Sequence, residues 1–282
     1  MSRSEPLTVV AADGVRLAAT LWHPDPEAPA GRAVAINAGA GIPARYYERF
    51  AAWLADRGQP TITYDYRGVG GSRPASLKGY DACVEDWGSK DCAAVLDTLS
   101  RRFPRAELAV VGHSIGGFVT GLMAGGERVA RLALVGTHTG YWRDYAPRAR
   151  LPMYVTWHVL MPAVARLAGY FPARRFGLPE DLPLGVALDW ARRRRPEPWW
   201  YLKRADGSPD AGRIAEVVAR FDAYRADALI VSLTDDPFAT AAATATQLII
   251  NNGGTLRYDG ASTSTNRAFT LNDTVGAVID AS

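Results

Sequence analysis

Short apolar segments alternate with segments of helical periodicity through the first half of the chain. Apolar runs of strand length lie at residues 33–37, 61–64, 108–111 and 132–135. Between them, apolar positions recur at helical spacing, at Tyr47, Phe50, Ala51 and Leu54 and again at Cys92, Val95, Leu96 and Leu99. This spacing predicts amphipathic helices. Because strands and helices alternate, we expect right-handed crossovers and a mostly parallel sheet with helices on both faces, that is, an α/β fold.

The chain departs from this alternation in three places. Two β-type runs at residues 7–10 and 15–22 flank Asp13-Gly14, a turn signal that predicts an antiparallel hairpin. From Tyr141 onward Trp, Tyr, Pro and Arg become frequent, which predicts an inserted helical cap, and after Gln247 a β-like run rich in Ser, Thr and Asn follows. We therefore expect a first core segment, a helical cap, a second core segment with one strand and one helix, and an atypical C-terminal tail, at residues 1–140, 141–226, 227–247 and 248–282.

One motif carries a candidate nucleophile. Gly112-His113-Ser114-Ile115-Gly116 directly follows a predicted buried strand and opens a helix. A G-x-S-x-G sequence in this context predicts a sharp turn that exposes the serine hydroxyl. Ser114 also lies at a helix N-terminus, where backbone N–H groups stabilise developing negative charge. The alternative is a glycine-rich turn with an incidental serine, but the strand-to-helix context favours a nucleophile.

A nucleophilic serine needs N–H donors for the oxyanion that its attack creates. One candidate donor is the N–H of Ile115, directly after the serine. The other should come from a loop after an earlier strand, and Ala38-Gly39-Ala40-Gly41 follows the apolar run at residues 33–37. A glycine-rich loop alone is often only a turn, but together with the serine motif it predicts donors at Gly39 and Ala40.

Three motifs occur in a fixed order along the chain: Tyr64-Asp65-Tyr66-Arg67-Gly68-Val69-Gly70-Gly71-Ser72, the Ser114 motif, and Thr234-Asp235-Asp236-Pro237-Phe238. Together they resemble the α/β-hydrolase superfamily, near its bacterial serine aminopeptidases and monoglyceride lipases, over about residues 8–240. The resemblance implies an α/β-hydrolase fold and a serine hydrolase that cleaves an ester or amide through an acyl-enzyme on Ser114. It also implies that Asp236 orients the catalytic histidine, with Asp235 as second choice and a helix N-cap as the structural alternative. Asp65 and Arg67 would brace the neighbouring loop.

The histidine of this machinery is not found where the resemblance predicts it. These enzymes carry their triad in the order serine, acid, histidine, whereas the four histidines all precede Asp236: His23, His113, His138 and His158. His138 is the candidate for a substitute base, because it follows a strand at the sheet edge where Ser114 is expected. A serine without a base is a poor nucleophile. The alternative function is therefore a catalytically inactive hydrolase scaffold that at most binds a small apolar ligand.

The tail coincides with the place where that histidine is missing. From Asn251 onward it resembles a repeat strand of autotransporter passenger domains, and one such repeat cannot bury its own apolar face. We hypothesise that the last strand, histidine loop and final helix of a hydrolase were replaced by fusion, frameshift or truncation. A mass spectrum and re-sequenced coding region with a histidine-bearing ending would contradict this hypothesis. A surface-acting autotransporter fragment is disfavoured, because no secretion signal is seen.

Composition narrows the function classes. A chain of 282 residues with 48% hydrophobic and 22% charged residues can bury a full-sized core. The net charge of +3 is mildly basic, and we interpret the run Arg192-Arg193-Arg194-Arg195 as a solvated helix face, not a nucleic-acid or membrane site. The two cysteines, Cys83 and Cys92, fit neither a disulfide framework nor a metal site. No metal or organic cofactor is expected.

The same features bear on location and substrate. The most apolar window, residues 157–171, is interrupted by Pro162 and Arg166 and falls short of the roughly 20 apolar residues that span a bilayer. With no signal peptide seen, we expect a cytoplasmic protein acting on a small-molecule ester or amide. Tyr141 and Trp142 of the predicted cap are candidates for binding an apolar acyl or aromatic group. The pattern does not predict the oligomeric state.

Overall fold

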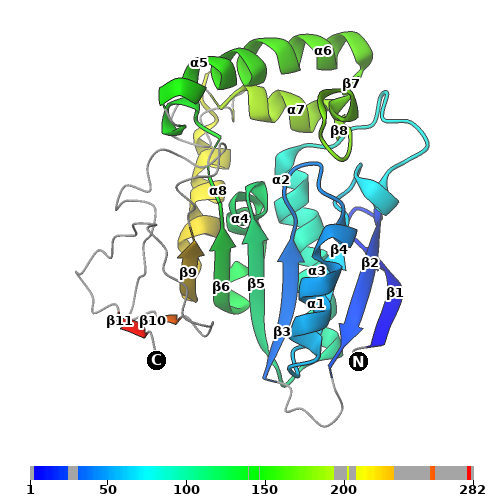
Figure 1. Ribbon diagram of the computed structural model, residues 1–282, viewed down its shortest axis with the longest axis vertical. Coiled ribbons are helices and arrows are strands. Elements are labelled where there is room, and N and C mark those ends of the chain that lie inside the picture. Colours follow the sequence, from blue (N-terminus) through cyan, green and yellow to red (C-terminus); the bar gives the residue numbers. More distant parts are fainter. Residues whose placement is uncertain are drawn as a thin grey trace.

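The computed structural model describes residues 3–24, 31–138, 140–145, 147–193, 202 and 208–231, together with two short strands at 255–257 and 278–280 (Figure 1). Within these residues a seven-stranded sheet has the order β1-β2-β4-β3-β5-β6-β9. Its strands are β1 (Arg3–Val10), β2 (Arg16–His23), β3 (Arg32–Asn37), β4 (Thr61–Tyr64), β5 (Glu107–His113), β6 (Val129–Val135) and β9 (Asp227–Val231). The β2 strand pairs antiparallel with β1 and β4, and the remaining pairs are parallel. The predicted hairpin and mostly parallel sheet are confirmed.

Helices cover both faces of this sheet, as predicted. Alternate residues of β3 explain why: Val34 and Ile36 pack with Ala51 and Leu54 of α1, whereas Ala33 and Ala35 belong to a larger cluster on the other face. The covering elements are η1 (Ala44–Tyr47), α1 (Glu48–Ala55), α2 (Val84–Asp86), the π-helical η3 (Trp87–Cys92), α3 (Ala93–Arg102) and α4 (Ile115–Gly121). The predicted stripe of Cys92, Val95, Leu96 and Leu99 is fully buried. Short 3-10 turns η2 (Gly70–Ser72) and η4 (Gly126–Arg128) complete this part.

A helical cap lies over the carboxyl ends of the parallel strands (Figure 1). It consists of η5 (Trp142–Asp144), α5 (Pro147–Val155), the π-helical η6 (Thr156–Leu160), α6 (Met161–Ala168), β7 (Tyr170–Phe171), η7 (Ala173–Phe176), β8 (Leu182–Pro183) and α7 (Leu184–Ala191). Arg193, at the end of α7, is fully buried over the rings of Phe118 and Trp190 at 4.0 and 5.2 Å. The interpretation of Arg193 as part of a solvated helix face is therefore wrong, because cation–π packing holds this side chain inside.

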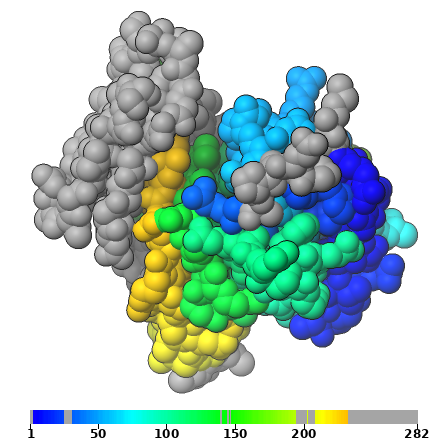
Figure 2. Space-filling model, turned by 90° about the horizontal axis from the view of Figure 1, so that it is seen from below, coloured from blue at the N-terminus to red at the C-terminus, as the bar shows by residue number. Residues whose placement is uncertain are grey.

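The predicted cap at residues 141–226 extends too far. Its last helix, α8 (Ala211–Asp222), packs against the sheet side of the molecule: the ring of Phe221 lies 5.7 Å from that of Phe118 in α4. The hydroxyl of Tyr224 donates to the Thr120 carbonyl of the same helix. Among the coloured residues of Figure 2, α8 and β9 lie at one side and the β1–β2 hairpin lies at the opposite side. The helical character predicted for this region holds for α8, but the helix packs on α4 and not over the cavity.

Most of the predicted tail lies outside the described residues. Of it the structure describes β10 (Thr255–Arg257) and β11 (Val278–Asp280), which pair in parallel. The resemblance of this segment to a passenger repeat stays a prediction. No helix among the described residues has the length and apolarity that a membrane crossing requires.

Candidate active site

Ser114 occupies a strained turn between β5 and α4. Its backbone has φ 55° and ψ −123°, and it is the single non-glycine residue with positive φ among those the structure describes. Side-chain-bearing residues pay about 1–3 kcal/mol for such a conformation, and it persists only where the surroundings enforce it. Here the Ser114 N–H donates to the Val135 carbonyl of β6 at 2.9 Å.

Glycines around Ser114 make this turn possible. A Cβ at Gly112 would lie 2.6 Å from the Cα of Gly117, and a Cβ at Gly116 would overlap the carbonyl oxygen of Asn37 in β3. A Cβ at Gly117 would overlap the side chain of Thr137. The backbones of β3, β5 and α4 are therefore in direct contact, which explains why small residues stand two positions either side of the serine.

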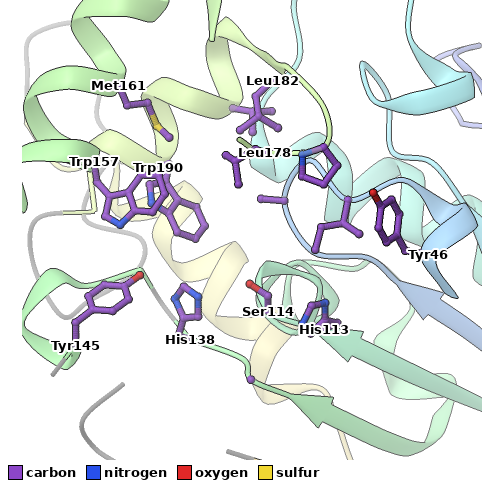
Figure 3. Close-up of a pocket in the computed structure, with 15 residues that line it drawn as sticks. Tyr46, His113, Ser114, His138, Tyr145, Trp157, Met161, Leu178, Leu182 and Trp190 are labelled. Carbon is purple, nitrogen blue, oxygen red and sulfur yellow. The ribbon is translucent and has the colours of Figure 1, made fainter. Parts of the chain in front are cut away.

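A cavity of about 280 Å³ opens in front of Ser114. Figure 3 shows the Ser114 hydroxyl and the His138 ring facing the same space, with Trp157 and Trp190 of the cap across from them. The remaining walls are largely apolar, and the cavity is lined by Ala40, Ile42, Tyr46, His113, Ser114, Gly136, His138, Tyr145, Trp157, Met161, Leu178, Pro179, Leu182, Val186 and Trp190. Such a lining suits an uncharged, apolar group.

Of the three predicted oxyanion donors, Gly39 already has a hydrogen-bond partner. The Gly39 N–H donates to the hydroxyl of Tyr47 at 3.0 Å, so it is already used. Ala40 lines the cavity beside Ser114, and Ile115 begins α4, whose first N–H groups have no partner within the helix. The prediction of Gly39 as a donor therefore conflicts with the structure, whereas Ile115 and Ala40 remain candidates.

His138 reaches the cavity from the loop after β6, as the sequence predicts. Its ring is held edge-on by Tyr145 and Trp190, at centroid distances of 5.8 and 5.7 Å. The Nδ1 atom accepts the N–H of Gly140 at 3.1 Å. In the neutral ring the proton then lies on Nε2. To take a proton from Ser114 at Nε2, this histidine would have to change tautomer and give up the Gly140 bond.

The other three histidines have different surroundings. Nδ1 of His113 lies 2.8 Å from the Tyr47 hydroxyl, on the side of the Gly39 loop. His23 pairs with Glu5 at 2.7 Å in the β1–β2 hairpin. His158 is buried in the cap, and its Nδ1 donates to the Ala191 carbonyl at 2.8 Å. That none of these three histidines acts as the base stays a prediction.

The predicted acid cannot be placed. Asp236 and the second choice, Asp235, lie outside the described residues, as does the rest of their motif. The described part of the strand that leads to them, β9, ends at Val231 beside β6. The role of Asp236 stays a prediction.

Aromatic residues do line the cavity, but not the predicted pair. Tyr141 and Trp142 are absent from its lining; Trp142 packs against Tyr154 at a centroid distance of 5.1 Å. The aromatic walls are Tyr46, Tyr145, Trp157 and Trp190 instead. Composition identified the cap as aromatic-rich, whereas the choice of which rings face the cavity depends on how α5, η6 and α7 pack.

Asp65 and Arg67 have structural contacts, as expected. The Asp65 carboxylate accepts the N–H groups of Ala44 and Gly71 at 2.7 and 2.8 Å. Arg67 is buried and pairs with Asp91 and Asp13 at 2.7 and 2.6 Å. Its hydrogen bond holds the pKa of Asp13 well below its usual range. This network braces the loop after β4.

Neither cysteine has the character of a reactive thiolate. Cys83 and Cys92 are both free thiols. Burial raises the pKa of each to about 12, so both remain protonated near neutral pH. Cys92 packs against the Tyr64 hydroxyl at 3.1 Å.

The sheet order, the strained serine at the end of β5 and the cap above it define the α/β-hydrolase fold. Comparison with known families agrees: the model of the family described as serine aminopeptidase, S33, matches residues 28–251. The chain belongs to this family.

Individual relatives are more distant. A segment of 116 residues is 36% identical to the "Putative carbamate hydrolase RutD" of Variovorax paradoxus (strain S110), covering 40% of this chain and 41% of that protein. The chain thus spans less than half the length of this curated relative. A hypothetical protein of Pseudomonas aeruginosa aligns with a TM-score of 0.50 and 16% identity, over 81% of this chain and 85% of that one. The structure of DcsB in complex with its substrate analogue aligns with a TM-score of 0.50 and 15% identity, over 81% of this chain and 90% of that one. These structural likenesses show the fold.

Proposed function

We propose that the chain is a serine hydrolase that cleaves an ester or amide with an apolar acyl or aromatic group through an acyl-enzyme on Ser114. The observation that carries this proposal is the strained backbone of Ser114 at the floor of an apolar cavity. Such strain is retained where an exposed hydroxyl is needed.

The reaction follows from the groups around the cavity. Ser114 Oγ attacks the substrate carbonyl carbon and loses its proton to a base, while the N–H groups of Ile115 and Ala40 stabilise the oxyanion. Collapse of the tetrahedral intermediate expels the alcohol or amine, which takes up the proton, and water then hydrolyses the acyl-enzyme. We assign Asp236 as the carboxylate that orients the base, and we consider His138 as that base.

A second candidate function is an inactive scaffold that binds a small apolar ligand. Two observations favour it: no histidine follows Asp236 in the sequence, and Nδ1 of His138 already accepts the Gly140 N–H. A serine hydroxyl without an activating base reacts slowly.

Labelling with a fluorophosphonate separates the two functions, because phosphonylation reports an activated serine without knowledge of the substrate. The proposal predicts that the wild type is labelled and that Ser114→Ala, which lacks the reacting hydroxyl, is not labelled. Loss in His138→Ala but not in His23→Ala, a matched control in the distant hairpin, assigns the base. A folded wild type without labelling supports the scaffold.

The substrate class is tested next with chromogenic compounds. We expect turnover of a p-nitrophenyl ester with a medium-length acyl chain, abolished by Ser114→Ala. A carbamate belongs in the same panel, because the relative from Variovorax paradoxus is named for that bond and the attack on a carbamate carbonyl needs the same groups. A small-molecule substrate and a cytoplasmic location remain predictions from the sequence.

A further inference from the structure

The hydroxyl of Tyr47 connects the two loops that flank the cavity. Tyr47 ends η1, and its hydroxyl accepts the Gly39 N–H at 3.0 Å. The same hydroxyl lies 2.8 Å from Nδ1 of His113, the residue directly before Ser114. The two rings also meet edge to face, with centroids 6.0 Å apart. One side chain therefore bridges the loop after β3 and the turn after β5.

The donors and acceptors present allow a direction to be assigned to these hydrogen bonds. Gly39 N–H can only donate, so Tyr47 accepts there and its single proton is available for His113. Burial raises the pKa of Tyr47 to about 12, so the hydroxyl keeps this proton at neutral pH. In this assignment the Tyr47 hydroxyl donates to Nδ1 of His113, and the neutral imidazole carries its own proton on Nε2. The hydrogen bonds thus run from the Gly39 amide through the Tyr47 hydroxyl to His113.

The loop is also packed directly on His113. A Cβ at Gly39 would lie 2.8 Å from Cδ1 of Ile42 and 3.2 Å from Nδ1 of His113, so a larger residue would have to displace the side chain of Ile42 or His113. Gly39 and the hydrogen bond of Tyr47 thus set how closely the loop approaches the Ser114 turn. Ala40, the next residue, lines the cavity.

We propose that Tyr47 is a positioning residue that fixes the Gly39–Ala40 loop against the Ser114 turn, so that the Ala40 amide, rather than the Gly39 amide, serves with Ile115 as an oxyanion donor. The catalytic part of this inference rests on the proposed serine hydrolase. The structural part, the anchoring of the loop by Tyr47, does not depend on the proposed activity. A small displacement of a donor is costly, since a shift of about 1 Å at a reacting group can slow a reaction by about 100-fold.

Tyr47→Phe tests the anchor, because it removes the bridging hydroxyl and keeps the ring. The matched control is Tyr224→Phe, which removes a hydroxyl hydrogen bond to the Thr120 carbonyl on α4 without touching the loop. Amide exchange followed by NMR should show the Gly39 amide exchanging about 10-fold faster or more in Tyr47→Phe and unchanged in Tyr224→Phe. Equal exchange at Gly39 in wild type and Tyr47→Phe would overturn the anchor.

The catalytic part is read from labelling kinetics. Tyr47→Phe should lower the maximal rate of phosphonylation about 10- to 100-fold with little change in the probe concentration at half-saturation, because the transition state alone needs the oxyanion donors. Tyr224→Phe should keep the wild-type rate. A Tyr47→Phe variant with the wild-type maximal rate would overturn the positioning role.

A measurement on the wild type tests the hydrogen-bond direction even if the Tyr47→Phe variant does not fold. The ¹⁵N shifts of the His113 imidazole should report an unprotonated Nδ1 and a protonated Nε2. A proton on Nδ1 would overturn the hydrogen-bond direction. If the wild type is not phosphonylated, the proposed function fails while the exchange and imidazole measurements still decide the anchor.

Discussion

The Ser114 turn and the cap above it are held by contacts of different kinds. At the turn, backbone meets backbone: Gly112 and Gly116 lie where any side chain would overlap Gly117 or Asn37. In the cap, side chains meet side chains, as in the pair Trp157 and Trp190, whose rings lie 5.6 Å apart. Backbone contacts leave no room to adjust, whereas packed side chains can rearrange. Substitutions at the turn should therefore destabilise the fold, whereas substitutions in the cap should mainly change substrate selectivity.

The largest effect is expected at the turn. Gly116→Ala places a Cβ onto the Asn37 carbonyl oxygen, which is backbone of the central strand β3 and has little freedom to move. We expect a loss of at least about 3 kcal/mol in the free energy of unfolding, measured by urea denaturation. Gly31→Ala is the control, since a Cβ there meets nothing within 4 Å. Equal stability of the two variants would contradict the rigid turn.

A smaller effect, on selectivity more than on stability, is expected in the cap. Trp190→Phe shortens one wall of the cavity and should cost about 1–2 kcal/mol of stability. If the chain is a hydrolase, the ratio of kcat/KM for long over short p-nitrophenyl acyl esters should rise about 10-fold. Trp53→Phe, on the half-exposed face of α1, should leave the ratio unchanged. The same ratio in wild type and Trp190→Phe would remove this ring from substrate selection.

The same contrast explains what the sequence could predict. The Ser114 turn depends on a few adjacent residues whose steric needs are local, so the motif around Ser114 predicts its strand-to-helix position. The arrangement of the cap depends on tertiary packing. Composition therefore indicates aromatic walls, but the predicted residues are Tyr141 and Trp142, whereas Tyr145 and Trp190 line the cavity. The same composition predicts helical structure up to residue 226 without indicating that α8 packs on α4.

Tyr47 shows a different limit. Its spacing with Phe50, Ala51 and Leu54 predicts a position on the apolar face of a helix. This pattern depends on the apolar ring and carries no information about the hydroxyl. A signal was present, because a tyrosine soon after a glycine-rich loop has a hydroxyl that needs a partner when buried. The partners, Gly39 in the loop after β3 and His113 at the end of β5, meet only in the folded chain.

A gain in stability is expected from Ser114→Gly. Glycine adopts positive φ without the cost that a Cβ imposes, and relief of this strain outweighs the entropy that glycine loses on folding. We expect a rise of about 1 kcal/mol in the free energy of unfolding, measured by urea denaturation, with labelling abolished. Ser114→Ala keeps the Cβ and so serves as the matched control that loses labelling without the gain. A destabilised Ser114→Gly would show that the turn is not strained.

The smallest effect is expected at Asp181, whose ion pairs join the cap to the loop carrying Arg73, with the Arg73 Nη1 to Asp181 Oδ2 distance at 3.1 Å. Burial raises the pKa of Asp181, but hydrogen bonds from Arg174 and Arg73 outweigh it and hold that pKa below the usual 3.8. A lowered folded-state pKa contributes stability that is present above about pH 4 and lost as the pH falls through the folded value. Asp181→Asn should therefore cost about 1 kcal/mol at pH 7, since the Asp181 side chain is buried but both arginine partners are partly exposed to solvent. It should also flatten the fall in melting temperature between about pH 5 and pH 3. Arg73→Gln should reproduce part of this change and add little to Asp181→Asn; full additivity of the two would mean that the cap and the core are not coupled through this pair.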